Sequence, residues 1–300
     1  MKLPLSFTLV FVVVLTSLFF CCKKATSDNE TILKGGVTIL VDETLAPIIE
    51  DQIAVFESEY NAKIILDAKS EKEASLAFIK DTSRIIVLSR TLNDSELKYF
   101  EKLKITPKTT KIGTDAITFI TNKKNKDTLL ALEDVVKFLK GTPQNRVKGI
   151  VFDNPNSSTV RYLNELSGIT SLPEKNVYSF KNNSEVVKFV AENDGMIGVV
   201  GLNWLYQPTA DVKEYLKNVS VMSLKGIGGK EFYAPTQNNI AEGTYPMSRD
   251  LYIINCQGYS GLGMGFASFV AGDIGQRIIL KSGLLPVRVP GRKILINGKI

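Results

Sequence analysis

The sequence predicts an α/β fold with two lobes rich in βα units. Short apolar runs of Val and Ile alternate along the chain with segments whose apolar residues recur at helical spacing. Strand–helix alternation of this kind is typical of a parallel sheet covered by helices. The chain has 300 residues, 44% of them hydrophobic, which is enough for about two domains of average size.

The first part of the chain predicts three strands, each followed by a helix. Glu73 lies three residues after Ser70, a spacing typical of a capping box at a helix start. The predicted strands span 37–41, 63–66 and 84–88, and the predicted helices span 46–60, 70–80 and 94–103.

The second part continues the alternation. Its predicted strands are 116–121, 149–152, 196–200 and 251–254, the last clear strand of the chain. Its predicted helices are 133–140, 158–166 and 184–192, followed by a glycine-rich lead into one helix over 261–279.

The N-terminus has the pattern of a secretory signal, which we place at residues 1–21. Lys2 precedes an uncharged apolar run that ends at Cys21 and Cys22. Bacterial lipoproteins carry their lipidated cysteine at this place, and a small residue precedes it, so the similarity favours acylation of Cys22 over Cys21. Residues 22–32 are then a polar tether. The alternatives are an uncleaved membrane anchor and a chance pair of cysteines.

The composition excludes several kinds of chemistry. The chain has no histidine, so Ser–His and Cys–His pairs and histidine metal ligands are ruled out. We expect neither a metal nor a cofactor. The net charge of +6 comes from 37 basic and 31 acidic residues. The basic residues are spread along the chain, which favours a small anionic ligand over nucleic acid. After lipidation only Cys256 remains, so no disulfide framework is expected.

Hydroxyl residues follow four of the predicted strands at the point where the next helix starts. A helix N-terminus offers free amides and a positive dipole end, and an Arg fork suits a tetrahedral anion. The repetition predicts an anion-binding cradle, although any one of these hydroxyls could simply cap its helix. The candidate residues are Thr44, Leu45 (through its amide), Ser70, Ser89, Arg90, Ser157, Ser158, Thr159 and Arg161.

Taken in order, several segments resemble the phosphate-binding component of phosphate ABC transporters, in the lipoprotein form common in the Bacteroidetes group. The similarity extends from about residue 35 to 295. It is carried by LSRTLN (88–93) with Glu96, TDAI (114–117), TNK (121–123), NSSTVR (156–161), DGMIG (194–198), YPMSRDLY (245–252), GFASF (265–269) and GLLP (283–286).

This resemblance implies a type II periplasmic-binding-protein fold with a ligand cleft between two lobes. One lobe would contain residues 33–113 and 256–300, and the other residues 114–255. Chain crossings near Gly113 and Asn255 would form the hinge.

The resemblance also implies roles for individual residues. The family's S-G-T phosphate loop matches residues 157–159, with Ser158 in place of glycine, and Thr44, Leu45 and Ser70 match the first two turns. The family's aspartate after the third strand and its arginine before the loop are Arg90 and Asp153 here, so the two charges are exchanged. A carboxylate is needed to accept the proton of phosphate, and Asp153 or Asp115 could supply it. Without such an acceptor, the ligand could be sulfate.

The resemblance therefore implies a non-enzymatic receptor on the periplasmic side of the cell envelope. It would bind inorganic phosphate, deliver it to an ABC transporter permease, act as a monomer held to the membrane by its lipid, and have no nucleic-acid partner. Three alternatives remain: a binding protein for another oxyanion, an adhesion or structural module on the same fold, and a hydrolase. The hydrolase would use Ser95 with Lys98, which have the S-x-x-K spacing of some serine acylases.

Overall fold

The computed structural model describes residues 30–80 and 84–289. The predicted signal peptide (1–21) and the candidate lipidation sites Cys21 and Cys22 lie outside the described residues, as does most of the predicted tether. Within the described ranges, none of the helices has the length and apolar character that a membrane crossing requires.

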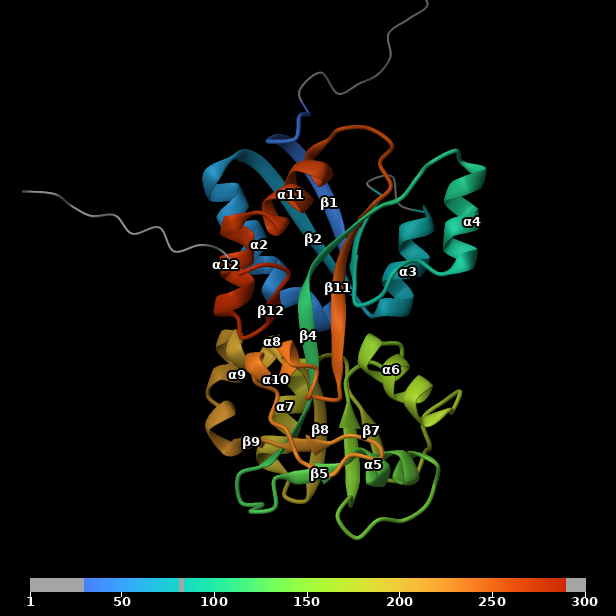
Figure 1. Ribbon diagram of the computed structural model, residues 1–300, viewed down its shortest axis with the longest axis vertical. Helices are drawn as coiled ribbons and strands as arrows, with labels where there is room; N and C mark the ends of the chain where they lie inside the picture. Colours follow the sequence, from blue (N-terminus) through green and yellow to red (C-terminus); the bar gives the residue numbers. More distant parts are fainter. Residues whose placement is uncertain (1–29, 81–83, 290–300) are drawn as a thin grey trace, which may run out of the picture. The chain divides into compact units, whose positions relative to one another are not determined.

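A mixed sheet forms the centre of the fold (Figure 1), with strand order β2-β1-β3-β11-β4-β8-β6-β7. Two further strands, β9 and β12, pair with β4, and β5 pairs with β10 in a separate small sheet. The strands are β1 (Lys34–Asp42), β2 (Asn61–Lys69), β3 (Ile85–Leu88), β4 (Lys108–Asn122), β5 (Leu129–Ala131), β6 (Gly149–Phe152), β7 (Val177–Ser179), β8 (Met196–Gly201), β9 (Val219–Val221), β10 (Ser223–Lys225), β11 (Ser248–Asn255) and β12 (Leu285–Pro286).

The helices confirm the predicted βα order. Besides the short 3₁₀ turns η1 (Glu43–Leu45) and η2 (Leu216–Asn218), they are α2 (Ala46–Glu59), α3 (Glu71–Lys80), α4 (Asp94–Lys102), α5 (Leu132–Leu139), α6 (Ser158–Ser167), α7 (Asn183–Glu192), α8 (Asn203–Tyr206), α9 (Ala210–Lys213), α10 (Gln237–Ala241), α11 (Leu262–Ala271) and α12 (Asp273–Lys281). Of these, α8, α9 and α10 are short and were not predicted, because four or five residues carry too little periodicity to detect.

Helices cover both faces of the sheet, so inner strands such as β3, β6 and β8 are buried on both sides. In β1, Ile39 and Val41 join a core with α2 and α11, whereas Leu40 joins a second core with α3 and α4. Because side chains alternate between faces along a strand, a continuous apolar run such as 37–41 fits a strand covered on both faces. Figure 1 shows α2, α11 and α12 on one side of the upper half and α3 and α4 on the other.

Two strands, β4 and β11, link an upper half of the fold, which contains β1, β2 and β3, to a lower half, which contains β6, β7 and β8. The first part of β4 pairs with β11, and its last part pairs with β8. Both pairings are antiparallel, as is that of β11 with β3. The expectation of a parallel sheet is therefore correct for β1, β2 and β3 and for β6, β7 and β8, but wrong for the central strands.

The C-terminal part differs from the sequence expectation in two ways. The single helix predicted over 261–279 is two helices, α11 and α12, separated at Gly272. The helices pack closely at Gly275, where an added Cβ would lie 2.4 Å from the Val270 carbonyl oxygen. A short strand, β12, also follows β11. It was missed because two residues give no pattern.

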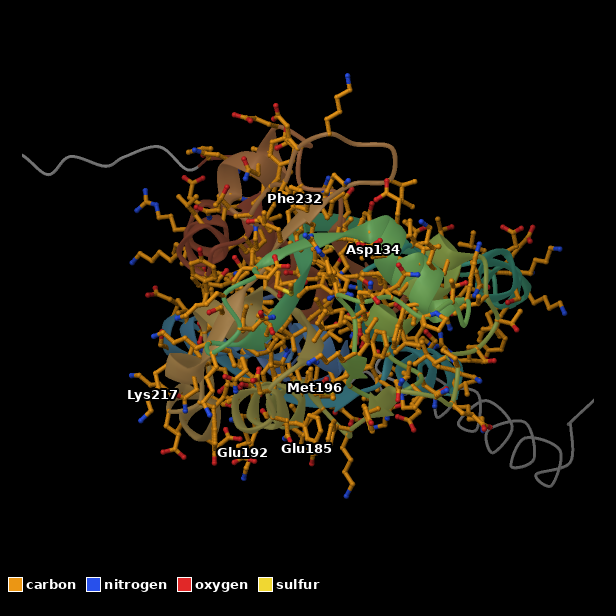
Figure 2. All side chains as sticks on the ribbon, turned by 90° about the horizontal axis from the view of Figure 1, so that it is seen from below. Asp134, Glu185, Glu192, Met196, Lys217 and Phe232 are labelled. Atoms are coloured by element: carbon orange, nitrogen blue, oxygen red, sulfur yellow. The ribbon has the colours of Figure 1, made fainter. Side chains whose placement is uncertain are left out.

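Charged side chains of both signs cover the lower end of the molecule (Figure 2). Glu192 and Lys217 are exposed there, and Asp134 and Glu185 are partly exposed. This end therefore carries mixed charge, in keeping with the spread of basic residues along the chain.

Candidate functional site

The first part of the site lies at the carboxyl end of β1. Asp42 accepts a hydrogen bond from the Thr44 amide (3.2 Å) and another from the Thr44 hydroxyl (2.9 Å), which fixes the η1 turn. The Thr44 carbonyl oxygen accepts from Asn203 Nδ2 (2.9 Å) and Trp204 Nε1 (3.1 Å), which belong to the lower half. Thr44 and Leu45 are fully buried, and this turn is thus held between the two halves.

The second part is the turn between β6 and α6. Ser157 is the N-cap of α6 and accepts from the Val160 amide. Its hydroxyl donates to Asp153 (2.5 Å), and the Thr159 hydroxyl donates to the same Asp153 oxygen (2.8 Å). Asp153 and residues 157–159 are all buried.

Arg249, on β11, joins these two turns. Its Nη1 donates to the Ser158 hydroxyl (2.7 Å), and its Nη2 donates to Thr44 Oγ1 (3.2 Å) and to Asp115 Oδ2 (3.0 Å). Thr44 Oγ1 and Ser158 Oγ lie 3.0 Å apart, although 114 residues separate them in sequence. We call Asp42, Thr44, Asp115, Ser158 and Arg249 the inner cluster.

Sequence reasoning did not identify Arg249 as a site residue. The signal that could have found it is its place on β11, where it shares one face of the strand with the buried Leu251 and Ile253. A buried arginine requires partners for its charge, so an arginine at an inward strand position indicates a polar site.

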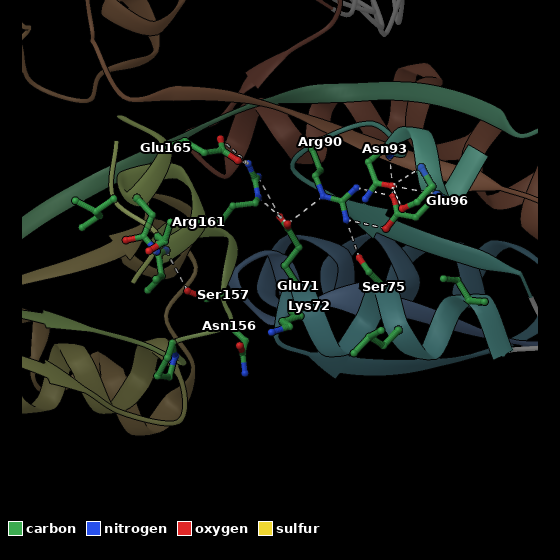
Figure 3. A pocket seen from close by; sticks show the side chains of 18 of the residues that line it. Glu71, Lys72, Ser75, Arg90, Asn93, Glu96, Asn156, Ser157, Arg161 and Glu165 are labelled. Atoms are coloured by element: carbon green, nitrogen blue, oxygen red, sulfur yellow. Dashed lines mark hydrogen bonds and ion pairs between the residues drawn. The ribbon is translucent and has the colours of Figure 1, made fainter. Parts of the chain in front are cut away.

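The predicted residues Arg90 and Arg161 form a second group around Glu71, which Figure 3 shows between them. Arg161 donates to both Glu71 oxygens (2.7 and 3.1 Å), and Arg90 Nε donates to Glu71 Oε1 (3.0 Å). Glu71 begins α3 and Arg161 lies on α6, so this group also spans the two halves. We call Glu71, Arg90 and Arg161 the outer cluster.

The guanidinium donors of the outer cluster are already engaged by protein groups. Arg90 also donates to Glu96 (2.8 and 2.9 Å) and to Ser75 (2.9 Å), and Arg161 donates to Glu165. The outer cluster lines a cavity of about 720 Å³ between α3 and α6, which also reaches Ser157.

The remaining predicted residues lie close to the outer cluster. The Ser70 hydroxyl donates to Glu73 (2.6 Å) within the first turn of α3. The Ser89 hydroxyl lies 3.5 Å from Glu71. Thr44, Ser158 and Asp115 are thus gathered around Arg249, whereas Ser89, Arg90 and Arg161 are gathered around Glu71.

Burial raises the pKa of several carboxyl groups at the site. It does so for Asp42 and Asp115, against the opposing charge of Arg249. The pKa of Asp153 rises to about 6, again through burial. Glu43 has a pKa of about 8, because it is buried and lies near the charge of Asp153. The Asn183 side-chain amide donates a hydrogen bond to each of these carboxyls, from Nδ2 to Glu43 Oε2 (2.9 Å) and to Asp153 Oδ2 (3.1 Å).

The proposed hydrolase residues lie on an exposed surface of α4. Ser95 donates its hydroxyl and its amide to Asn93, which caps the helix, and Ser95 and Lys98 are both exposed. This arrangement explains Ser95 as part of the helix N-terminus. Over residues 30–80 and 84–289, no group of three or more His, Cys, Asp or Glu side chains is placed to hold a metal ion.

Two α/β halves linked by two strands, with hydroxyls and a buried guanidinium between them, define a class of two-part ligand-binding protein. Residues 25–273 match the sequence model of the PBP superfamily domain, so the chain belongs to this family. Its fold is a mixed α/β fold of the periplasmic-binding-protein type.

Among curated proteins, the chain is 26% identical to the phosphate-binding protein PstS of Borreliella burgdorferi, over 91% of this chain and 95% of that protein. It is 24% identical to PstS of Pseudomonas aeruginosa, over 85% of this chain and 84% of that protein.

Among solved structures, an ABC-type phosphate transport receptor from Vibrio cholerae has the same fold. Its TM-score is 0.62 at 19% identity, over 84% of this chain and all of that chain. A protein from Clostridium perfringens that was crystallised with bound phosphate gives a TM-score of 0.68 at 19% identity, over 85% of this chain and all of that chain.

Proposed function

We propose that this protein binds inorganic phosphate outside the cytoplasm and passes it to the permease of an ABC transporter, without catalysing a reaction. The observation that carries the proposal is the contact of Arg249 with the hydroxyls of Thr44 and Ser158, which come from opposite halves. A tetrahedral anion bound there would touch both halves and a positive charge at once. The PstS relatives, named for phosphate binding, support phosphate as that anion.

In this proposal the ligand site consists of the inner cluster with Leu45, Asp153, Ser157 and Thr159, and the outer cluster closes over it. Residues 33–113 and 256–300 make one lobe and residues 114–255 the other. The hinge lies where β4 and β11 pass between the lobes, near Gly113 and Asn255. The pairing of these strands is irregular at Leu251, which faces Gly113, and this irregularity supports a point of bending there.

The proposal also includes a lipid anchor on Cys22, with Cys21 as the alternative, and a monomer on the periplasmic side of the envelope. Metabolic labelling with a radioactive fatty acid tests the anchor. Cys22→Ala should abolish the label, and Cys21→Ala should leave it. Loss of label only in Cys21→Ala would assign the other cysteine, and an unlabelled natural sequence would contradict the anchor.

Phosphate binding can be followed with the protein's own fluorescence. Trp204 is the one tryptophan of the chain, is 5% exposed, and donates to the Thr44 carbonyl beside the inner cluster. Phosphate titrated into anion-stripped protein should change its emission saturably, and sulfate should do so only at much higher concentration. Absence of phosphate binding by calorimetry up to millimolar concentration would contradict the proposal.

Ser158→Ala provides the site variant for this titration, and Ser167→Ala provides its control. Both serines are buried and lie at opposite ends of α6. Removing the Ser158 hydroxyl takes away a partner of Arg249 and should weaken phosphate binding at least about tenfold. Ser167→Ala should bind phosphate like the natural sequence.

A further inference from the structure

A groove with apolar side chains on its rim lies on the surface of the upper half. It has a volume of about 630 Å³ and lies between the start of β1, the end of α2 and the turn that joins α11 to α12. Three of its lining residues are large hydrophobic side chains with much exposed surface: Ile32 (44%), Leu33 (42%) and Ile274 (44%). Single exposed apolar residues are ordinary, but three around one groove indicate a contact surface. We call this feature the apolar groove.

The turn before β1 forms one wall of the apolar groove. The Thr31 amide donates to the Lys34 carbonyl oxygen (2.8 Å), and the Leu33 amide donates to the Thr31 hydroxyl (3.2 Å). These bonds close the turn without any need for apolar side chains, and turns more commonly contain Gly, Asn, Asp or Ser. The backbone of Ile32 also lies against α11, where a Cβ added at Gly265 would be 1.6 Å from the Ile32 carbonyl oxygen. The turn is thus packed against a helix while its two apolar side chains remain exposed.

Basic residues lie beside these apolar side chains. Arg288 lines the apolar groove and pairs with Asp273 (3.0 Å), and both side chains are more than half exposed. Lys34 follows the turn, is exposed, and has no ion-pair partner among the described residues. Exposed apolar side chains next to positive charge are typical of surfaces that bind at the interface of an anionic membrane.

The position of the apolar groove in the chain favours a lipid surface as its partner. Ile32 lies ten residues after Cys22, the proposed site of the lipid anchor. A fully extended chain spans at most about 3.6 Å per residue, so the anchor holds the apolar groove within about 36 Å of the bilayer surface. At this short range the effective concentration of lipid is high, so a weak intrinsic affinity is sufficient for contact. A partner in solution has no such advantage.

We propose that the apolar groove is a membrane-contact surface. Ile32, Leu33 and Ile274 enter the headgroup region of an anionic bilayer, and Lys34 and Arg288 face its phosphate groups. The inference rests on the lipid anchor in the proposed function and adds the face of the protein that meets the membrane. Figure 1 shows α11 and α12 on one side of the upper half and α3 on the other. The cavity beside the outer cluster, between α3 and α6, therefore stays open to solution during this contact.

Quenching by nitroxide-labelled lipids tests the contact in the lipidated protein, reconstituted in vesicles that contain phosphatidylglycerol. A fluorescent thiol label can be placed at one position at a time. In the proposed function Cys21 is removed with the signal and Cys22 is acylated. Cys256 is fully buried, and burial raises the pKa of its thiol to about 12, so it does not react. The natural sequence, treated in the same way, gives the background.

The label is placed at Ser268→Cys and, as the control, at Lys98→Cys. Ser268 is exposed and lines the apolar groove, whereas Lys98 is exposed on α4. An interfacial protein surface enters the bilayer by several ångströms, so quenching should be at least about threefold stronger at position 268 than at position 98. Equal quenching at the two positions would overturn the inference.

Leu33→Glu combined with Ile274→Glu tests which side chains make the contact. Two carboxylates oppose entry into an anionic interface, so quenching of the label in the apolar groove should fall to the level of the control position. Leu97→Glu combined with Leu103→Glu is the matched control, since both leucines are similarly exposed (43% and 42%) and lie on or next to α4. It should leave the quenching unchanged. Unaltered Trp204 emission shows that each pair folds, and quenching that survives the first pair would refute the apolar contact.

Two further results separate other occupants and the anchor from the membrane contact. If a second copy of this chain occupied the apolar groove, lipid would not quench the label, and energy transfer between labelled copies would rise with protein concentration. That result would overturn the inference. A natural sequence without fatty-acid label would contradict the proposed anchor, whereas an anchored protein that binds phosphate but shows no quenching at position 268 would refute the contact surface alone.

Discussion

Arg249→Met separates the role of the inner cluster in binding from its role in stability. The substitution keeps an unbranched side chain of similar length but removes the guanidinium that contacts Thr44, Ser158 and Asp115. Breaking a buried ion pair from one side leaves the other charge uncompensated, which costs about 3–5 kcal/mol. Asp115 is fully buried, so we expect the full effect and a fall in Tm of about 6–20 °C.

The same substitution should weaken phosphate binding strongly. Two terminal nitrogens of Arg249 face the two site hydroxyls, and a hydrogen bond to a charged group contributes about 1.5–3 kcal/mol. Losing two such bonds to the ligand corresponds to about 3–6 kcal/mol, or a Kd about 10²–10⁴-fold higher. Titration followed by Trp204 emission or calorimetry measures this change.

A second variant distinguishes a binding defect from a folding defect. The double variant Arg249→Met with Asp115→Asn also removes the carboxylate that would be left without its ion-pair partner. Its Tm should return most of the way to that of the natural sequence, while its phosphate binding stays weak. Arg146→Met serves as the control for loss of a positive charge, since Arg146 is exposed and its partner Asp127 lies outside both clusters. If folded Arg249→Met binds phosphate within threefold of the natural sequence, Arg249 is not the anion-binding arginine.

Three further predictions concern stability and closure. In the folded protein the pKa of Glu43 is about 8, above its usual value of 4.5. The free energy of unfolding should therefore fall as the pH rises between these two values, by at most about 1.4 kcal/mol per pH unit. In Glu43→Gln, denaturant titrations from pH 6.5 to 8 should lose most of this slope, and an unchanged slope would contradict the assignment. Glu71→Gln should weaken the link to Arg161 and raise the phosphate dissociation rate in stopped-flow measurements more than it changes the association rate, whereas equal changes in both rates would argue against a role in closure. Gly265→Ala should lower stability by about 1–3 kcal/mol because its Cβ would lie 1.6 Å from the Ile32 carbonyl oxygen. Gly36→Ala should be tolerated in thermal melts, because its Cβ would lie 3.8 Å from the Lys63 carbonyl oxygen.

The strands and long helices could be predicted from the sequence because their signal is local. The apolar run at 149–152 and the helical spacing over 46–60 correspond closely to β6 and α2. The direction of β4 and β11 could not be predicted in this way, because it depends on which strand each one joins. The division of 261–279 at Gly272 was missed for a similar reason, since the close approach of Val270 to Gly275 depends on how α11 and α12 pack.

The candidate site was predicted in part. The hydroxyls at strand ends were found because their position before a helix can be read from sequence, and Thr44 and Ser158 do meet across the halves. The prediction considered only residues in the turns that follow strands, however, and Arg249 lies within a strand. Its role depends on pairing between β4 and β11, which places it opposite Asp115.

The three arginines differ in which of their donors remain for a ligand, and the carboxylates around them determine that difference. Arg90 and Arg161 share Glu71 and have Glu96 and Glu165 as additional partners, so an anion bound to either would have to displace a carboxylate. Arg249 has one ion-pair partner, Asp115, and its other contacts are neutral hydroxyls, which an anion can replace or share without releasing a charge. Sequence spacing shows where an arginine lies relative to a helix, but it does not show which carboxylates have already taken its hydrogen bonds. In the proposed site, we therefore expect the outer pair to act as a contact between the halves and Arg249 to be the arginine that meets the ligand.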